Sequence, residues 1–233
     1  MSLFNDIEVE DLGLAEDKVG GGSFGRFEKT GYYDVVIEKA YAVVSNGGAF
    51  SVNLTLKRED GAKLNVTEYI SSGTAKGCKN YYLDKDGNKA YLPGYNKIKS
   101  LDALLGFDRA YPKTEKDKVM LWDKDLKKEL PVDKEVIKEW LGKKIGILVT
   151  KKLEDKYGEE SNYREVFDVE HFLKDGRTRN EIVAGTSGFK DKWLATKNES
   201  YILDKREQSK NKPYPPVENE NTSSDAIPDD APF

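Results

Sequence analysis

The sequence predicts a mainly β fold (α+β) with one or two short helices and a disordered acidic C-terminal tail. Apolar residues alternate with polar ones in several segments between positions 33 and 173, and turn-forming residues separate these segments. The 13 Tyr, 9 Phe and 3 Trp supply large side chains for a core, although 34% of the residues are charged. From position 204 onward the sequence is polar, proline-rich and poor in apolar residues. We therefore expect an acidic, glycine-rich arm (1–25), a folded domain (26–204) and a disordered acidic tail (205–233).

The first part of the predicted domain is a meander of three strands. Alternating apolar residues place these strands at 33–44, 50–56 and 63–70, and the turns between them contain Asn46-Gly47 and Asp60-Gly61. Residues 77–95 are expected to form a hairpin with Asp86-Gly87 at its tip.

Helices and two long strands are expected to follow. Apolar residues at helical spacing predict a helix over 95–107, and 118–122 is a further apolar run. A second short helix is predicted to begin at Pro131 and end at Gly142. Residues 144–152 and 163–173 are expected to pair as antiparallel strands across a turn at 155–161, with a short helix at 191–195 and the last core residue at Leu203.

This order of elements fits an OB-fold-like antiparallel barrel, the oligonucleotide-binding fold. That fold has five strands, a helix that interrupts the series, and long loops that grip single strands. A β-sandwich fits the number of strands nearly as well.

A single cysteine and a single histidine restrict the chemistry. Cys78 has no partner for an internal disulfide, and no Cys/His set is present for a structural zinc site. His171 lies in a segment with strand periodicity and is interpreted as a structural residue. The chain contains no phosphate-binding GK[ST] loop and no HExxH motif. The string Asp84-Lys85-Asp86-Gly87 resembles part of a calcium-binding loop, but Tyr82 occupies its first ligand position and Pro93 its twelfth, so calcium binding is not expected. We therefore expect no catalytic residues, no metal and no cofactor.

Two further features bear on location. There is no run of 18 apolar residues, so no membrane span is expected. The acidic N-terminal segment lacks the basic and apolar regions of a secretory signal. A cytoplasmic protein is expected, in the host cytoplasm if the protein is viral.

The charge is distributed unevenly. Residues 1–17 contain six acidic residues and 213–233 contain five, with no basic residue in either segment. The remaining chain has 31 acidic and 38 basic residues, a net charge of about +7. A basic body between acidic ends is typical of nucleic-acid-binding proteins with acidic tails, although a solvated surface beside a disordered terminus has the same pattern.

The segment 76–99 mixes tyrosines with lysines, the combination by which proteins stack unpaired bases and neutralise phosphates. Tyr81 or Tyr82 is the expected stacking residue. The alternative is that the tyrosines pack against the inner face of the hairpin while the lysines form its solvated rim. Together with weaker candidates elsewhere, the predicted nucleic-acid-binding residues are Lys76, Lys79, Tyr81, Tyr82, Lys89, Tyr91, Tyr95, Lys97, Lys99, Lys57, Arg58 and Trp122.

The C-terminus combines a polar tether, several acids and a terminal Pro-Phe. These residues resemble the acidic tip of bacterial single-stranded DNA-binding proteins, where Asp residues precede Ile-Pro-Phe, and the Asp-rich, Phe-terminated tails of phage analogues. Here the Ile-Pro pair precedes the last two acids instead. The resemblance covers roughly the last ten residues, while the Tyr-Leu-Pro-Gly-Tyr segment and the chain length look more like phage-encoded single-stranded DNA-binding proteins. The matching residues are Asp225, Ile227, Pro228, Asp229, Asp230, Pro232 and Phe233.

The resemblance implies a function in DNA replication, repair and recombination. Such a protein coats single-stranded DNA without sequence preference, and its tip recruits a polymerase, a helicase or primase, or a nuclease. Two alternatives remain open. One is a magnesium-dependent phage nuclease that uses carboxylates such as Asp84, Asp86 and Glu68. The other is an adaptor protein that does not bind DNA.

Overall fold

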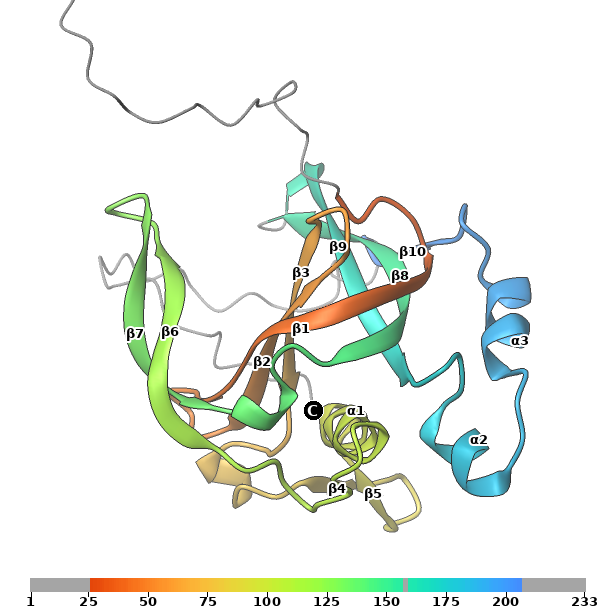
Figure 1. The fold of residues 1–233 in the computed structure, drawn as a ribbon, viewed down its shortest axis with the longest axis horizontal. Helices are drawn as coiled ribbons and strands as arrows, with labels where there is room; N and C mark the ends of the chain where they lie inside the picture. Colours follow the sequence, from red (N-terminus) through yellow and green to blue (C-terminus); the bar gives the residue numbers. More distant parts are fainter. Residues whose placement is uncertain (1–25, 157–158, 207–233) are drawn as a thin grey trace, which may run out of the picture.

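Eight strands form one sheet in the computed structural model of the chain, which describes residues 26–156 and 159–206 (Figure 1). The side chains of residues 155–162 are outside that description. The main path of the sheet runs β10-β8-β1-β2-β3; β9 pairs with β8, β7 pairs with β1, and β6 pairs with β7. The strands of this sheet are β1 (Gly31–Val44), β2 (Phe50–Lys57), β3 (Lys63–Tyr69), β6 (Glu115–Asp123), β7 (Lys128–Val136), β8 (Lys144–Lys156), β9 (Glu159–Leu173) and β10 (Ile202–Asp204).

The other elements are short and surround this sheet. A separate two-stranded sheet contains β4 and β5. These other elements are β4 (Tyr81–Leu83), β5 (Lys89–Tyr91), the helices α1 (Pro93–Leu104), α2 (Arg179–Ala184) and α3 (Phe189–Thr196), and the 3-10 turns η1 (Thr74–Lys76) and η2 (Lys138–Trp140). None of the helices in the described part of the chain is long and apolar enough to cross a membrane.

Strand β1 holds the sheet together because its two halves pair with different strands. From Gly31 to Val36 it pairs with β8, and from Val36 to Val44 it pairs with β2, both antiparallel. The register with β2 shifts between Ile37 and Lys39, where a bulge allows the strand to bend. The meander, the helix that follows it and the two long strands match the expected OB-like order. Among the described residues, no main-chain pairing joins β3 to β9, so the sheet does not close into a barrel.

The core lies on one face of this bent sheet. Val52, Leu54 and Leu56 of β2 are buried, as are Leu64 and Val66 of β3, because every second side chain of a strand points to the same face. These side chains belong to one apolar cluster that also includes residues of β8, β9 and α1. The expected mainly β core is therefore confirmed.

Helix α1 covers the open side of the sheet between β3 and β9, both of which it contacts. Pro93 occupies its first turn, where the missing N–H costs nothing. Ile98 and Leu101 are buried against the sheet. Gly94 permits this close approach, since a Cβ atom there would lie 2.3 Å from the carbonyl oxygen of Tyr69.

Ion pairs connect β3 to β9 where the main chain does not. Lys97 of α1 donates to Glu68 of β3 at 2.8 Å and to Asp168 of β9 at 3.4 Å. Lys152 of β8 also donates to Asp168. Burial raises the pKa of Glu68, and the Lys97 ammonium opposes that rise. Side-chain ion pairs through Lys97 therefore connect β3 and β9, which main-chain hydrogen bonds would connect in a closed barrel. We call these ion pairs the bridge.

The carboxylate of Asp102 anchors the loop that leaves α1. This side chain is 1% exposed and accepts hydrogen bonds from the Arg109 main-chain nitrogen and guanidinium, both at 2.8 Å. It also accepts one from the buried Trp140 indole at 3.1 Å. Arg109 in turn pairs with Glu139 at 2.5 Å. Three segments, α1, the 105–114 loop and η2, therefore meet on one buried carboxylate.

The predicted helix over 131–141 is wrong. Residues 128–136 form β7, paired with β6 from Glu115↔Val136 to Asp123↔Lys128. The turn between them depends on Asp123, whose carboxylate accepts from the main-chain nitrogens of Asp125 and Leu126 at 3.0 and 2.8 Å. The helical spacing of apolar residues from Ile137 to Leu141 corresponds only to the single turn η2, in which Trp140 is fully buried.

The other helix predictions differ from the structure in extent. The helix expected over 95–107 is observed at 93–104, and the one expected over 191–195 is observed at 189–196. Helix α2 and strand β10 were not predicted. The arm at 1–25 and residues 207–233 of the tail lie outside the described residues.

Helix α3 is held to the sheet by a glutamate network on β9. The Glu170 carboxylate accepts from Lys197 at 2.6 Å, from Thr150 of β8 at 2.6 Å and from the Trp193 indole at 3.0 Å. Trp193 also packs on Leu148 in a second, smaller apolar cluster. Burial alone would raise the pKa of Glu170, but these hydrogen bonds outweigh it and lower the pKa below its usual value.

We expect Asp102→Ala to lower the free energy of unfolding by about 2–4 kcal/mol, because the substitution leaves the buried Trp140 indole and the Arg109 main-chain nitrogen without their acceptor, while the Arg109 guanidinium keeps Glu139. Asp117→Ala is the control, since the Asp117 pair with Lys138 is about half exposed and should cost less than ~1 kcal/mol. Urea denaturation of both variants measures the difference. Equal losses would contradict the anchoring role of Asp102.

The Glu170 network predicts a dependence of stability on pH. Its stabilisation is complete above the ordinary glutamate pKa of 4.5 and is lost as the pH falls through the lower pKa of the folded state. Thermal unfolding of the wild type should therefore become steeply pH-dependent below about pH 4.5, and Glu170→Gln should flatten that dependence. Glu165→Gln, which alters a more exposed pair with Lys151, should keep the wild-type slope. A Glu170→Gln profile parallel to the wild type would refute the prediction.

Candidate nucleic-acid interface

The segment with the densest mixture of tyrosine and lysine forms the β4–β5 hairpin. Tyr81 pairs with Tyr91 and Leu83 with Lys89. The Asp84 carboxylate closes the turn by accepting from the main-chain nitrogens of Asp86 at 2.9 Å and Asn88 at 2.8 Å. Gly87 has a φ of 81°, which accounts for glycine at this position. The expected tip at Asp86-Gly87 is therefore observed.

One pocket of about 360 Å³ collects five of the predicted binding residues. Its described lining contains three lysines and no acidic side chain. Tyr81 forms the aromatic centre, with the ammonium groups of Lys79 and Lys89 at 5.8 and 4.8 Å from its ring centroid. The lining residues are Ser72, Lys76, Lys79, Tyr81, Tyr82, Leu83, Lys89 and Leu92. We call this the hairpin pocket.

Two lining residues expose apolar surface beside these cations. Tyr82 is 45% exposed and Leu83 is 62% exposed. Tyr81, the ring beside the ammonium groups, is half-buried, so Tyr82 is the more accessible ring of the two. Accessible aromatic rings and ammonium groups on one surface are the combination that stacks a base and neutralises its phosphates. Binding by these residues stays a prediction, but the structure places them on one accessible surface.

Tyr91 and Tyr95 have different environments. The Tyr95 ring is 4% exposed and belongs to the core cluster, so it cannot stack on a base. It lies between Tyr91, at 5.0 Å between ring centroids, and Tyr111, at 5.6 Å. Tyr91 and Tyr111 are about half exposed. Sequence reasoning did not single out Tyr111. Its signal was the two basic residues that flank it, Arg109 and Lys113, because basic residues also flank the other candidate tyrosines.

The two lysines of α1 are also not equivalent. The ammonium of Lys97 is engaged in the bridge to Glu68 and Asp168, which makes it a structural charge rather than a free one. Burial alone would lower the pKa of Lys97, but these carboxylates raise it. Lys99 is half-buried on the same helix.

Lys57 and Arg58 lie at the far end of β2 from the hairpin pocket. The opposite end of that strand, at Phe50, hydrogen-bonds to Ile70, which begins the segment leading to the hairpin. Lys57 pairs with Glu38 at 3.7 Å, and Arg58 pairs with Asp60 at 2.6 Å. The structure therefore does not bring these two basic side chains together with the tyrosines of β4 and β5.

Trp122 lies on a different projection, the β6–β7 hairpin. Its side chain is 62% exposed, and Met120, on the same face of β6, is 44% exposed. Lys39 of β1 donates to the Met120 carbonyl and to Glu129 of β7, which fixes the hairpin to the sheet. Figure 1 shows this hairpin rising beside the sheet, away from β4 and β5.

A polar sheet face was missed by sequence reasoning. On the side of β2 and β3 opposite the core, Thr67 donates to Asn53 at 2.6 Å and Thr55 to Asn65 at 2.9 Å. Tyr41 of β1 is in register with Asn53, so it continues this row. The strand 2–3 face is where OB-folds bind oligonucleotides. The polar residues that alternate with the buried apolar residues of β2 and β3 were the sequence signal for this face.

The carboxylates considered for magnesium do not assemble. Glu68 is 7% exposed and paired with Lys97, whereas Asp84 is used by the hairpin turn. Within residues 26–156 and 159–206, no three His, Cys, Asp or Glu side chains are grouped to hold a metal ion. The partner-binding residues predicted between 225 and 233 lie outside the described part of the chain.

Comparison with known proteins does not assign this chain to a family. No family model matches the sequence, and a search of curated proteins found no significant match.

The contrast between the tyrosines can be measured as stability. Tyr95→Ala should lower the free energy of unfolding by about 3–5 kcal/mol because it empties a filled core position. Tyr82→Ala should change it by less than ~0.5 kcal/mol because the ring is exposed. Chemical denaturation of both variants tests this, and a large loss for Tyr82→Ala would make that ring structural.

Proposed function

We propose that this protein binds single-stranded DNA without sequence preference. The observation that carries the proposal is the hairpin pocket, which Lys76, Lys79 and Lys89 line together with Tyr81 and Tyr82, with the Lys79 and Lys89 ammonium groups over the Tyr81 ring. Ammonium groups neutralise phosphates, and aromatic faces stack on any base, so this surface favours unpaired strands and tolerates every sequence.

Charge and fold support the same proposal. The basic body attracts a polyanion, and its charge of about +7 is separated from the acids at both ends of the chain. The polar face of β2 and β3, with its exposed Thr67–Asn53 pair, lies where an OB-like sheet binds oligonucleotides.

The tail completes the proposed function. Asp225 to Phe233 would dock on a replication or recombination enzyme, with the Phe233 ring in an apolar pocket and the acids against basic residues. Such a protein coats exposed DNA in the cytoplasm, which is the host's if the protein is viral, and brings the repair or replication enzyme to it. The nuclease alternative has no observation in its favour, because its three carboxylates do not meet.

The test is fluorescence anisotropy of labelled oligo-dT and of a matched duplex at several salt concentrations. Wild type should prefer the single strand, and Lys79→Ala/Lys89→Ala should weaken binding while lowering the salt slope by about 1.4, at roughly 0.7 per lost phosphate contact. Tyr81→Ala/Tyr82→Ala should weaken binding by about 1–3 kcal/mol per lost stack.

Lys174→Ala/Lys192→Ala is the matched control, because it removes two exposed lysines outside the hairpin pocket. It should change affinity much less. Equal binding of single strand and duplex, or equal effects of the two lysine pairs, would overturn the proposal.

A further inference from the structure

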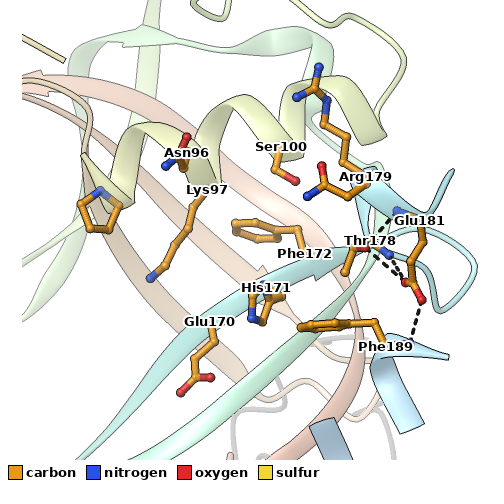
Figure 2. A pocket seen from close by; sticks show the side chains of 12 residues that line it. Asn96, Lys97, Ser100, Glu170, His171, Phe172, Thr178, Arg179, Glu181 and Phe189 are labelled. Atoms are coloured by element: carbon orange, nitrogen blue, oxygen red, sulfur yellow. Dashed lines mark hydrogen bonds between the residues drawn. The ribbon is translucent and has the colours of Figure 1, made fainter. Parts of the chain in front are cut away.

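A second pocket, of about 630 Å³, lies between α1, β9, α2 and the start of α3 (Figure 2). Asn96 and Ser100 line it from successive turns of α1, and His171 lines it from β9. Arg179 and Phe189 complete the opposite side. We call it the helix pocket.

The charged groups around the helix pocket already have partners. Lys97 is bound to Glu68, and Glu170 is bound to Lys197. Arg179 pairs with Asp108 at 2.9 Å. A free anion would therefore meet cations that are already neutralised, so the pocket is not built for a phosphate or a carboxylate.

Four neutral polar side chains of the lining, in contrast, are not used in hydrogen bonds within the described part of the chain. The side chains of Asn96, Ser100, Asn180 and His171 make no hydrogen bond to any described residue. Burial lowers the pKa of His171, so its ring is neutral at neutral pH and offers one donor and one acceptor. The two amides offer both kinds of group as well.

An aromatic wall stands beside these groups. The Phe189 ring meets the His171 ring edge-to-face, with 4.8 Å between centroids and an interplanar angle of 77°. Figure 2 shows both rings between β9 and the α3 start, below the polar side chains of α1. A planar heterocycle with donors and acceptors on its edge matches this combination of ring and amide groups.

The rim that carries Arg179 and Asn180 is fixed in place. Thr178 and Glu181 form a reciprocal capping box at the start of α2. The other Glu181 oxygen accepts from the Phe189 main-chain nitrogen at 2.7 Å, so one carboxylate ties α2 to α3. The pocket is therefore shaped before any ligand arrives.

We propose that the helix pocket holds one nucleobase, turned out of the strand that the hairpin pocket binds. This inference rests on the proposed function. Leu92 lines the hairpin pocket and the next residue, Pro93, lines the helix pocket, so both pockets adjoin the start of α1. The proposed strand crosses the start of α1 to reach from one pocket to the other. The base edge would pair with Asn96, Ser100 and His171, and its face would lie on Phe189.

The chain has one histidine, so the proton on Cε1 of the His171 ring gives one signal that belongs to no other residue. We would record that signal by NMR for the full-length protein while adding dT, dC and dA decamers, an abasic decamer with the same phosphates, and free nucleosides. Base-bearing decamers should shift the signal and the abasic decamer should leave it unmoved. If decamers bind by anisotropy without shifting it, the pocket inference fails and the proposed function stands.

If no decamer binds, the proposed function fails and the nucleosides decide about the pocket. A saturable shift with a free nucleoside then supports a base site, whereas an unmoved signal overturns it. Asn96→Ala should weaken binding of base-bearing decamers about fivefold and leave the abasic decamer unaffected. Ser100→Ala should act in the same direction, with Ser187→Ala, an exposed serine outside the lining, as its matched control. Equal losses for base-bearing and abasic decamers in Asn96→Ala would overturn the inference.

Discussion

Lys97 joins two strands that no main-chain hydrogen bond joins in the described part of the chain. Its ammonium reaches Glu68 on β3 and Asp168 on β9, and the helix that carries it fills the space between them. Buried ion pairs are costly to break because the remaining charge keeps its desolvation penalty. The position of α1 therefore depends on this bridge and on Asp102 at the other end of the helix. Both pockets flank α1, so the geometry of each depends on the same contacts.

The sequence was informative wherever a local pattern decided the structure. Alternation in β1, β2 and β3 predicted the strands and their buried face, and the turn residues predicted where the strands end. The sequence was less informative where the secondary structure of a segment depends on its pairing with another segment. Residues 131–136 became a strand because β6 pairs with them, a partner that Pro131 and the helical spacing of Ile137 and Trp140 do not reveal.

The same reason explains which candidate side chains lie on the surface. Tyr81 and Tyr95 look alike in the sequence, yet one lines an open pocket and the other is packed between two further tyrosines. Lys97 and Lys89 are both lysines of one basic segment, but only Lys97 faces a buried carboxylate. Exposure depends on the fold as a whole, so composition could predict the basic, aromatic character of segment 76–99 without separating its binding residues from its structural ones.

The close approach of Gly94 to Tyr69 has a consequence for how this protein can vary. The chain leaves β3 at Ile70, forms η1 and the β4–β5 hairpin, and returns at Leu92 next to its point of departure. An excursion whose two ends nearly touch is a cassette: it can lengthen, shorten or be exchanged while the sheet and α1 keep their places. That cassette carries Lys76, Lys79 and Lys89 of the hairpin pocket and the exposed ring of Tyr82, so this surface can change while the sheet stays the same.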